Sequence, residues 1–248
     1  MTYLKAEPHS FWGHLSRTSI CFRDPLDLEM SPSVGYWKIR GLAQSIRLLL
    51  EYIGEEFDDI QYECGPAPEY SRKDWEDVKP NMGLDFPNLP YYKDDDVNLT
   101  QTAAILAYVA EKHNIGGSTP KDRAVLAMIN GAVSDVRMAY VRLCYSSDFE
   151  KLRPGFVSDL PHLLKPFDEY LKTRSWISGD QLSYPDFNFY DLLDCLKTLE
   201  PNCLNAFPRL QQYITKFEAL PQIAAYMQSP RFLKWPMNNK MASWGGDK

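Results

Sequence analysis

The feature that most constrains the fold is a change of pattern at Ser118-Thr119-Pro120. Before it, short apolar strands alternate with amphipathic helices, whereas from Lys121 to about Met227 only helical periods remain. Strands and helices that alternate over about 85 residues predict one small α/β domain. The sequence therefore predicts an α/β domain at residues 30–113, a linker at 114–120, and an all-helical domain with a C-terminal tail at 121–248.

Residues 1–29 follow no helical or strand period, so we expect a poorly ordered extension there. Polar residues interrupt Ser10–Cys21, which argues against a secretory signal. A transit peptide remains an alternative, because this segment contains basic and hydroxyl-bearing residues but few acidic residues.

The α/β domain begins with a predicted strand at Ser33–Trp37 and a helix at Ala43–Ile53 that Gly54 ends. Further along we expect a strand near Asp59–Cys64 and a helical turn at Trp75–Lys79. Leu89–Tyr92 and Val97–Thr100 then predict a hairpin. After the hairpin we expect a helix that is capped by Thr102 and runs to Lys112. In the helical domain, Ser183 and Asp186 predict a capping box. Prolines predict helix breaks at Pro154, Pro161, Pro201, Pro208 and Pro221.

Composition excludes several classes of protein. A net charge of -6 and a pI near 5.3 argue against a nucleic-acid partner. No stretch approaches the roughly 18 consecutive apolar residues of a membrane span, which predicts a soluble protein without a membrane partner. The five cysteines are scattered without a C-x-x-C pair, so we expect reduced thiols in a cytoplasmic protein and no metal site.

Four motifs carry a resemblance to a known family: Gly35–Ala43 (GYWKIRGLA), Ile46–Tyr52 (IRLLLEY), Gly83–Tyr91 (GLDFPNLPY) and Leu99–Leu106 (LTQTAAIL). Together they closely resemble the mu-class glutathione transferases, and the match covers nearly everything except the first 29 residues. The resemblance implies a thioredoxin-like N-terminal domain of order β-α-β-α-β-β-α before the all-helical domain. It also implies a homodimer that conjugates reduced glutathione to hydrophobic electrophiles in detoxification, with glutathione as co-substrate and no permanently bound cofactor.

Tyr36 is the catalytic candidate, because it lies between a strand and a helix, where a hydroxyl can project into a cleft. A thiol with a pKa of roughly 8.5 needs about 2.7 kcal/mol of preferential thiolate stabilisation to lower that pKa by about two units. A preorganised hydroxyl can supply much of this by donating to the sulfur. By resemblance, Tyr36 is the tyrosine that does so as a neutral phenol.

The resemblance assigns the rest of glutathione to residues spread over the α/β domain. Gln101 and Thr102, at a helix N-terminus, correspond to the site of the γ-glutamyl carboxylate. Leu89 and Pro90, joined by a cis bond, correspond to the segment that pairs with the cysteinyl backbone. The full implied set is Tyr36, Trp37, Arg72, Trp75, Lys79, Asn88, Leu89, Pro90, Gln101 and Thr102, with Asp135 contributed by the partner subunit.

The second substrate is expected against an apolar wall that includes Ile39, Leu42, Val141 and Tyr145, and the Tyr145 hydroxyl is suited to stabilise a developing charge. Asn238 and Asn239 depart from the family pattern and predict a more polar pocket rim. Phe86 resembles a side chain that enters the other subunit of a dimer; an ordinary core phenylalanine is the alternative.

Three other functions compete with the transferase. A carrier of hydrophobic ligands and a glutathione-dependent isomerase remain open, because fold alone does not separate them from a transferase. A thiol–disulfide oxidoreductase is disfavoured, since no cysteine occupies the position of Tyr36.

Overall fold

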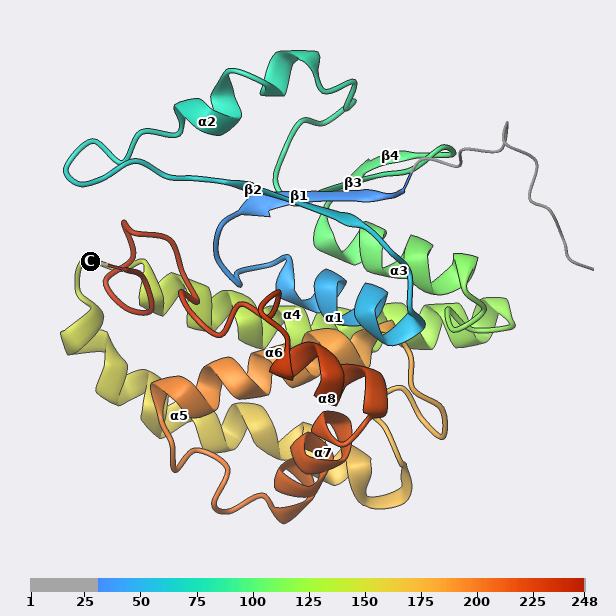
Figure 1. Ribbon diagram of the computed structural model, residues 1–248. Helices are drawn as coiled ribbons and strands as arrows, with labels where there is room; N and C mark the ends of the chain where they lie inside the picture. The colour runs from blue at the N-terminus through green and yellow to red at the C-terminus, as the bar shows by residue number, and fades with distance from the viewer. Residues whose placement is uncertain (1–30, 248) are drawn as a thin grey trace, which may run out of the picture.

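The computed structural model describes residues 31–247, so the extension predicted at residues 1–29 lies outside them. A four-stranded sheet of order β2-β1-β3-β4 lies along one side of the molecule (Figure 1). Strand β1 (Ser33–Trp37) runs parallel to β2 (Asp58–Tyr62) and antiparallel to β3 (Tyr91–Lys93), which pairs antiparallel with β4 (Asn98–Thr100). The mixed sheet places the end of β1, with Tyr36, at the centre of the domain.

Helices α1 (Gln44–Ile53) and α3 (Thr102–Lys112) lie between the sheet and the C-terminal helices, while the short α2 (Lys73–Glu76) lies on the sheet's other side (Figure 1). A 3-10 turn, Lys79–Asn81, follows α2. Helix α1 buries a continuous leucine-rich face and ends at Gly54, whose positive φ of 74° suits a residue without a side chain. The element order confirms the thioredoxin-like domain.

The C-terminal part is all-helical, as expected. Its α-helices are α4 (Pro120–Cys144), α5 (Phe149–Tyr170), α6 (Tyr184–Leu199), α7 (Pro208–Glu218) and α8 (Pro221–Gln228), with a 3-10 turn at Leu171–Thr173. Helix α6 is almost wholly buried because it packs against both α4 and α1. The predicted capping box begins it, and the Asp186 carboxylate accepts the Ser183 N–H at 3.0 Å.

The prediction that Pro154 and Pro161 break the chain is wrong, because α5 continues through both of them and through Pro166. All three prolines lie on the exposed side of α5, whereas its buried side carries Phe149, Leu160, Leu164 and Phe167. A proline inside a helix removes one hydrogen bond, and the carbonyl that it frees can bind water when it faces solvent. The apolar face therefore holds the helix together despite its prolines.

Smaller differences concern element ends. The second strand ends at Tyr62, before Cys64, and Pro90 immediately precedes β3 instead of lying inside a strand. Thr102 is the first residue of α3 and Gln101 occupies the N-cap position, so the prediction of Thr102 as the cap is wrong. The Thr102 hydroxyl instead donates to the Leu42 carbonyl at 3.3 Å.

In the described part of the chain, one helix, α4, is long and apolar enough to cross a membrane when only length and composition are considered. Its mean hydropathy is 1.2 over 18 residues. In the fold its buried side chains pack against α5 and α6, and they include Asn130 and Arg137, which bond to α6. One side of helix α4 therefore packs in the core of the C-terminal helices.

Candidate functional site

The turn between β1 and α1 holds Tyr36 in a defined position. The Tyr36 side chain is 7% exposed, and its hydroxyl oxygen accepts the Leu42 N–H at 3.2 Å. Gly41 has a φ of +44°, and a Cβ atom on it would lie 2.5 Å from Cε1 of Tyr36. The turn thus closes tightly over the ring, and the hydroxyl proton stays available for another acceptor.

Burial raises the pKa of Tyr36 above its ordinary value of 10.0. The Leu42 N–H and the positive charges of Arg47 and Arg137 act in the opposite direction, while Asp191 adds to the rise. Tyr36 is therefore a neutral phenol at physiological pH, and a neutral phenol is a hydrogen-bond donor.

A buried charge network lies beneath this turn and joins the two domains. Arg40, which follows Tyr36 in the turn, is 2% exposed and donates to Asp191 and to Asp194 of α6, at 2.7 Å each. Arg137 of α4 pairs with the other oxygen of Asp191 at 2.8 Å. Two arginines and two aspartates thus compensate one another under the turn, which is what buried charges require.

Neutral amides extend the network. Arg137 Nε donates to Asn188 Oδ1 at 2.9 Å, and Asn188 in turn donates to Asn130 at 2.8 Å. The sequence analysis missed Arg40 and Asp191 as supports of Tyr36. The available signal was a pair of acidic residues, Asp191 and Asp194, in the largely apolar run Phe187–Leu199, but nothing local names their partners.

Several predicted site residues gather in one apolar cluster. Tyr36, Ile39, Trp75 and Leu89 belong to the same group of buried side chains, and Trp37 and Leu42 pack against it. Trp75 stacks on Tyr91, with ring centroids 6.0 Å apart. The structure therefore brings residues from the end of β1, from α2 and from the segment before β3 to one place.

The charged and amide candidates lie on the surface of the same domain. Arg72 is exposed and pairs with Glu76 at 3.2 Å, and Lys79 is exposed at the start of the 3-10 turn. Asn88 is exposed, and its side-chain oxygen accepts the Leu89 N–H at 2.9 Å. The Leu89-Pro90 bond is cis, as the resemblance implies. Gln101 is exposed at the N-terminus of α3, with a φ of 73°.

Two predicted residues point away from the chain's own core. Asp135 lies exposed on α4. Phe86 is 80% exposed, so the alternative of an ordinary core phenylalanine is wrong.

The predicted wall for the second substrate involves both domains. Ile39 is buried, Leu42 and Val141 are half-buried, and Tyr145 is 40% exposed at the end of α4. The Tyr145 hydroxyl oxygen accepts the backbone N–H of Asn239 at 2.9 Å and lies within electrostatic range of Tyr36. Its own proton remains free to be donated.

The C-terminal tail, residues 233–247, crosses the boundary between the domains. The N–H groups of Arg40 and Gly41 donate to the carbonyls of Pro236 and Met237, at 2.9 Å and 3.1 Å. Farther along, Ser243 N–H donates to the Cys144 carbonyl at 2.8 Å. The tail thus ties the turn that carries Tyr36 to the end of α4.

The expectation that Asn238 makes the pocket rim polar is wrong. Asn238 is 3% exposed, and its amide nitrogen donates inward to the Tyr140 hydroxyl and to the Trp244 carbonyl. Asn239 does reach a cavity, although its side-chain oxygen is occupied by the Lys240 N–H. The backbone bonds of the tail turn Asn238 inward, which the residue type alone does not reveal.

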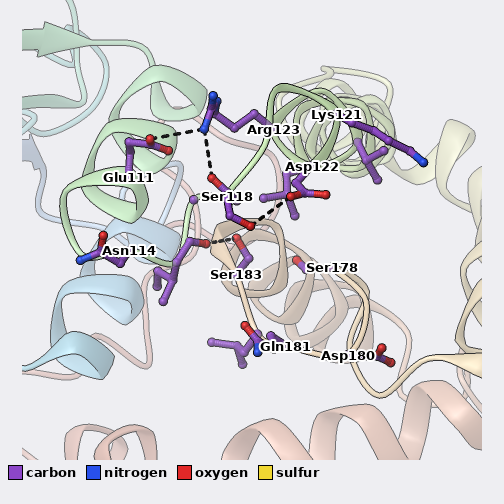
Figure 2. A pocket seen from close by; sticks show the side chains of 16 residues that line it. Glu111, Asn114, Ser118, Lys121, Asp122, Arg123, Ser178, Asp180, Gln181 and Ser183 are labelled. Carbon is purple, nitrogen blue, oxygen red and sulfur yellow. Dashed lines mark hydrogen bonds and ion pairs between the residues drawn. The ribbon is translucent and has the colours of Figure 1, made fainter.

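Two cavities stand out. The larger, of about 680 Å³, lies where the end of α3 meets the start of α4 and the loop before α6 (Figure 2). Its polar side chains largely bond one another, as Arg123 does with Glu111 and Ser118 with Asp122, and it contains none of the predicted site residues. The smaller, of about 310 Å³, is lined by Trp37, Ile39 and the tail. Within residues 31–247, no three His, Cys, Asp or Glu side chains gather as they would around a metal ion.

Comparison with known proteins places this site in a family. A model described as Glutathione S-transferase, N-terminal domain, matches residues 32–111, and one described as Glutathione S-transferase, C-terminal domain, matches residues 134–230. Glutathione S-transferase Mu 1 of Bos taurus is 50% identical over 212 residues, 86% of this chain and 97% of the relative. Glutathione S-transferase Mu 3 of Homo sapiens is 48% identical over 220 residues, 89% of this chain and 98% of the relative. The solved Pi-class glutathione S-transferase of Onchocerca volvulus superposes with a TM-score of 0.76 at 29% identity, covering 86% of this chain and 100% of that one.

Proposed function

This chain belongs to the mu class of glutathione S-transferases and conjugates glutathione, and from that premise we propose that Tyr36 holds the glutathione sulfur as a thiolate. The observation that carries the proposal is the bond from Leu42 N–H to the Tyr36 oxygen, at 3.2 Å. It occupies an acceptor position of the hydroxyl and leaves its proton to be donated to sulfur. A donor fixed before the reaction stabilises the developing charge without reorganisation.

The protein's part in the reaction is to ionise and position the sulfur. The thiol proton passes to solvent, the thiolate attacks the electrophilic carbon, and in a substitution the leaving group departs with the bonding electron pair. The positive charges of Arg47 and Arg137 favour negative charge near Tyr36, as their effect on the Tyr36 pKa indicates. No covalent bond to the protein is needed.

We assign the remaining groups of glutathione to the residues around this cluster. Arg72 and Lys79 are charged and exposed, suiting the glycyl carboxylate, and Trp75 covers the peptide. Asn88, Leu89 and Pro90 offer main chain to the cysteinyl backbone. Gln101 and Thr102, at the N-terminus of α3, receive the γ-glutamyl carboxylate, and Asp135 approaches its amine from the partner subunit.

The electrophile lies against the apolar side chains of Trp37, Ile39, Leu42 and Val141, which suits hydrophobic compounds. Tyr145 is placed to donate a hydrogen bond to charge that develops on the electrophile, because its oxygen already accepts the Asn239 N–H.

We further propose that the active form is a cytoplasmic homodimer, with Phe86 as the contact that enters the partner. We retain the division into residues 30–113, 114–120 and 121–248, with 1–29 as an extension. In support of that extension, the match to the N-terminal family model begins at residue 32.

The test compares the wild type with Tyr36→Phe in the conjugation of a generic aryl halide, with the absorbance of the bound thiolate titrated against pH. Loss of the hydroxyl should lower kcat by about 100-fold and raise the pKa of the bound thiol by about two units. An unchanged rate together with an unchanged thiol pKa would remove Tyr36 from the mechanism.

The carrier and isomerase alternatives receive no specific support from the fold or the site. Each would use the same apolar wall. The aryl halide assay separates a carrier from the transferase, because a carrier shows no turnover. An isomerase is separated by a second assay with an isomerisable unsaturated ketone, whose conversion consumes no glutathione.

A further inference from the structure

The smaller cavity, of about 310 Å³, shares Trp37 and Ile39 with the proposed electrophile wall and is bordered by three segments. These are the end of β1 with the residues after it (37–39), the end of β2 with its loop (62–64), and the C-terminal tail. A cavity of this size holds a single aromatic ring with its substituents.

The cavity walls are aromatic on several sides. Trp37, Tyr62 and Trp235 contribute rings, and Ile39 and Pro236 add apolar surface. Trp235 is 45% exposed, yet its indole N–H donates to Asp247 at 2.7 Å, which fixes the orientation of the ring. A flat aromatic group is the occupant that such walls favour, because rings stack on or meet one another edge to face.

The charged side chains at the cavity are two lysines and two carboxylates, and Lys240 is the group among them that is suited to an anion or an acceptor. Lys38 is neutralised by Glu63, at 2.7 Å. Lys240 Nζ instead donates to the backbone carbonyl of Cys64 at 2.8 Å, and no carboxylate in the described part of the chain pairs with it. Lys240 thus keeps its net charge and two N–H donors for a ligand.

The cavity adjoins the proposed place of reaction, because Trp37 and Ile39 belong both to its lining and to the proposed electrophile wall. Asn239 lines it, and the backbone N–H of the same residue donates to the Tyr145 hydroxyl, which lies within electrostatic range of both Tyr36 and Cys64. Of the residues assigned to glutathione, Trp37 alone lines the cavity, and Arg72, Trp75 and Lys79 do not. Bound glutathione therefore leaves this space open.

We propose that this cavity is a second-ring subsite, which binds the far end of an extended electrophile whose distal aromatic ring carries an anionic or acceptor group directed at Lys240. The assignment rests on the proposed function, since it takes the sulfur to lie at Tyr36. The favoured substrates are two-ring electrophiles, with the reacting ring beside Tyr36 and Tyr145 and the distal ring between Trp37 and Trp235.

A series of three aryl chlorides tests the subsite with the full-length protein. Each has a nitro group ortho to chlorine and a ketone para to it, and the ketone bears methyl, phenyl or carboxyphenyl. In every case the glutathione sulfur–carbon bond forms, the carbon–chlorine bond breaks, chloride leaves with the electron pair and the thiol proton goes to buffer. Each kcat/KM is divided by the rate constant of the uncatalysed reaction with glutathione.

The phenyl ketone should exceed the methyl ketone in normalised kcat/KM by about tenfold, mainly through KM, because the distal ring leaves water. Trp235→Ala should abolish most of that ratio. Met241→Ala is the matched control, since Met241 is an exposed apolar side chain of the same tail that does not line the cavity.

The carboxyphenyl ketone should exceed the phenyl ketone by a further factor of about five, and Lys240→Met should remove that factor. Lys234→Met, which removes the same charge from an exposed position on the tail outside the cavity, should retain it.

Equal normalised values for the methyl and phenyl ketones, or a ratio that survives Trp235→Ala, would overturn the proposal. Loss of the carboxylate effect in both lysine variants would overturn the assignment of the anion to Lys240. Failure of the proposed function gives a different result: conjugation of the methyl ketone would then be insensitive to Tyr36→Phe, whatever the ratios between ketones.

Discussion

Gly41 and Tyr36 are packed so closely that a Cβ atom on Gly41 would lie 2.5 Å from Cε1 and 2.8 Å from the hydroxyl oxygen of Tyr36. Real Cβ atoms do not approach other heavy atoms to such distances, so a side chain at position 41 displaces the Tyr36 ring. The absence of a side chain at this turn is therefore a condition for the position of the hydroxyl.

The first prediction concerns Gly41→Ala. The ring of Tyr36 must shift, and misplacing a catalytic group by about 1 Å can cost up to 100-fold in rate, so we expect kcat/KM for an aryl halide to fall by at least about tenfold. Gly54→Ala is the control, because Gly54 also has a positive φ, of 74°, but nothing within 4 Å. It should lose about 1 kcal/mol of stability and keep full activity, as urea unfolding and steady-state kinetics will show. Equal activity losses in the two variants would contradict the packing argument.

The second prediction concerns the charge network. Asp191→Asn leaves Arg40 and Arg137 buried with only Asp194 as a carboxylate between them. We expect the free energy of unfolding to fall by about 3 kcal/mol, because an uncompensated buried charge is costly. The measurement is urea unfolding at neutral pH, at a fixed protein concentration.

Asp194→Asn is the matched comparison for Asp191→Asn. The Asp194 side chain is 27% exposed and contacts Arg40, whereas Asp191 is 1% exposed and contacts both arginines. The loss of stability should therefore be about 1 kcal/mol or less. If Asp194→Asn were as destabilising as Asp191→Asn, Asp191 would not be the main counter-charge of the two arginines.

The third prediction concerns Asp94, at the hairpin between β3 and β4. Its carboxylate accepts bonds from Tyr92, Tyr108 and Lys112 and from two backbone N–H groups, and these bonds lower its pKa to about 2 despite burial. A depressed folded-state pKa means that the stabilisation is complete above the unfolded value of 3.8 and is lost as pH falls toward 2.

Asp94→Asn should thus be about 2 kcal/mol less stable than the wild type at pH 7, and the difference should shrink as the pH falls below about 4. Unfolding by urea at a series of pH values measures this difference. Asp96→Asn, at an exposed position two residues away, should show no such pH-dependent difference. A gap between wild type and Asp94→Asn that is constant over the series would argue against the assigned pKa.

The fourth prediction concerns assembly. Phe86→Ser removes a ring that is 80% exposed in the single chain, and it should shift the proposed dimer toward monomers by at least about tenfold in dissociation constant, measured by analytical ultracentrifugation. Leu152→Ser, at another exposed apolar side chain, on α5, should leave the dissociation constant unchanged. If Phe86→Ser has the same dissociation constant as the wild type, Phe86 is not the contact.

Local patterns predicted the sheet-bearing half of the fold well. The strand Ser33–Trp37 has the predicted bounds, and the helix that begins at Thr102 ends at Lys112 as predicted, because alternation, helical periodicity and nearby stop signals all lie within a few residues. The prediction failed at the prolines of α5, since a proline's effect on a helix depends on whether its side of the helix faces water. That property belongs to the tertiary structure.

The site was predictable where the residues form a contiguous motif and not where they meet across domains. Tyr36 and Gly41 stand within one motif, so a resemblance identified that turn. Arg40 and Asp191 are separated by 151 positions, and neither residue's neighbours specify the other. The inward direction of Asn238 likewise depends on backbone bonds between the tail and distant segments.

The order of synthesis also matters for the turn after β1. Synthesis proceeds from the N-terminus, so Tyr36 and Arg40 leave the ribosome long before the groups that complete their surroundings. Those groups are Asp191 and Asp194 on α6, and the carbonyls of Pro236 and Met237 in the tail, which accept the Arg40 and Gly41 N–H groups. A nascent chain thus carries the hydroxyl proposed to be catalytic early, but the surroundings that hold it in place are complete only after Met237 has been added.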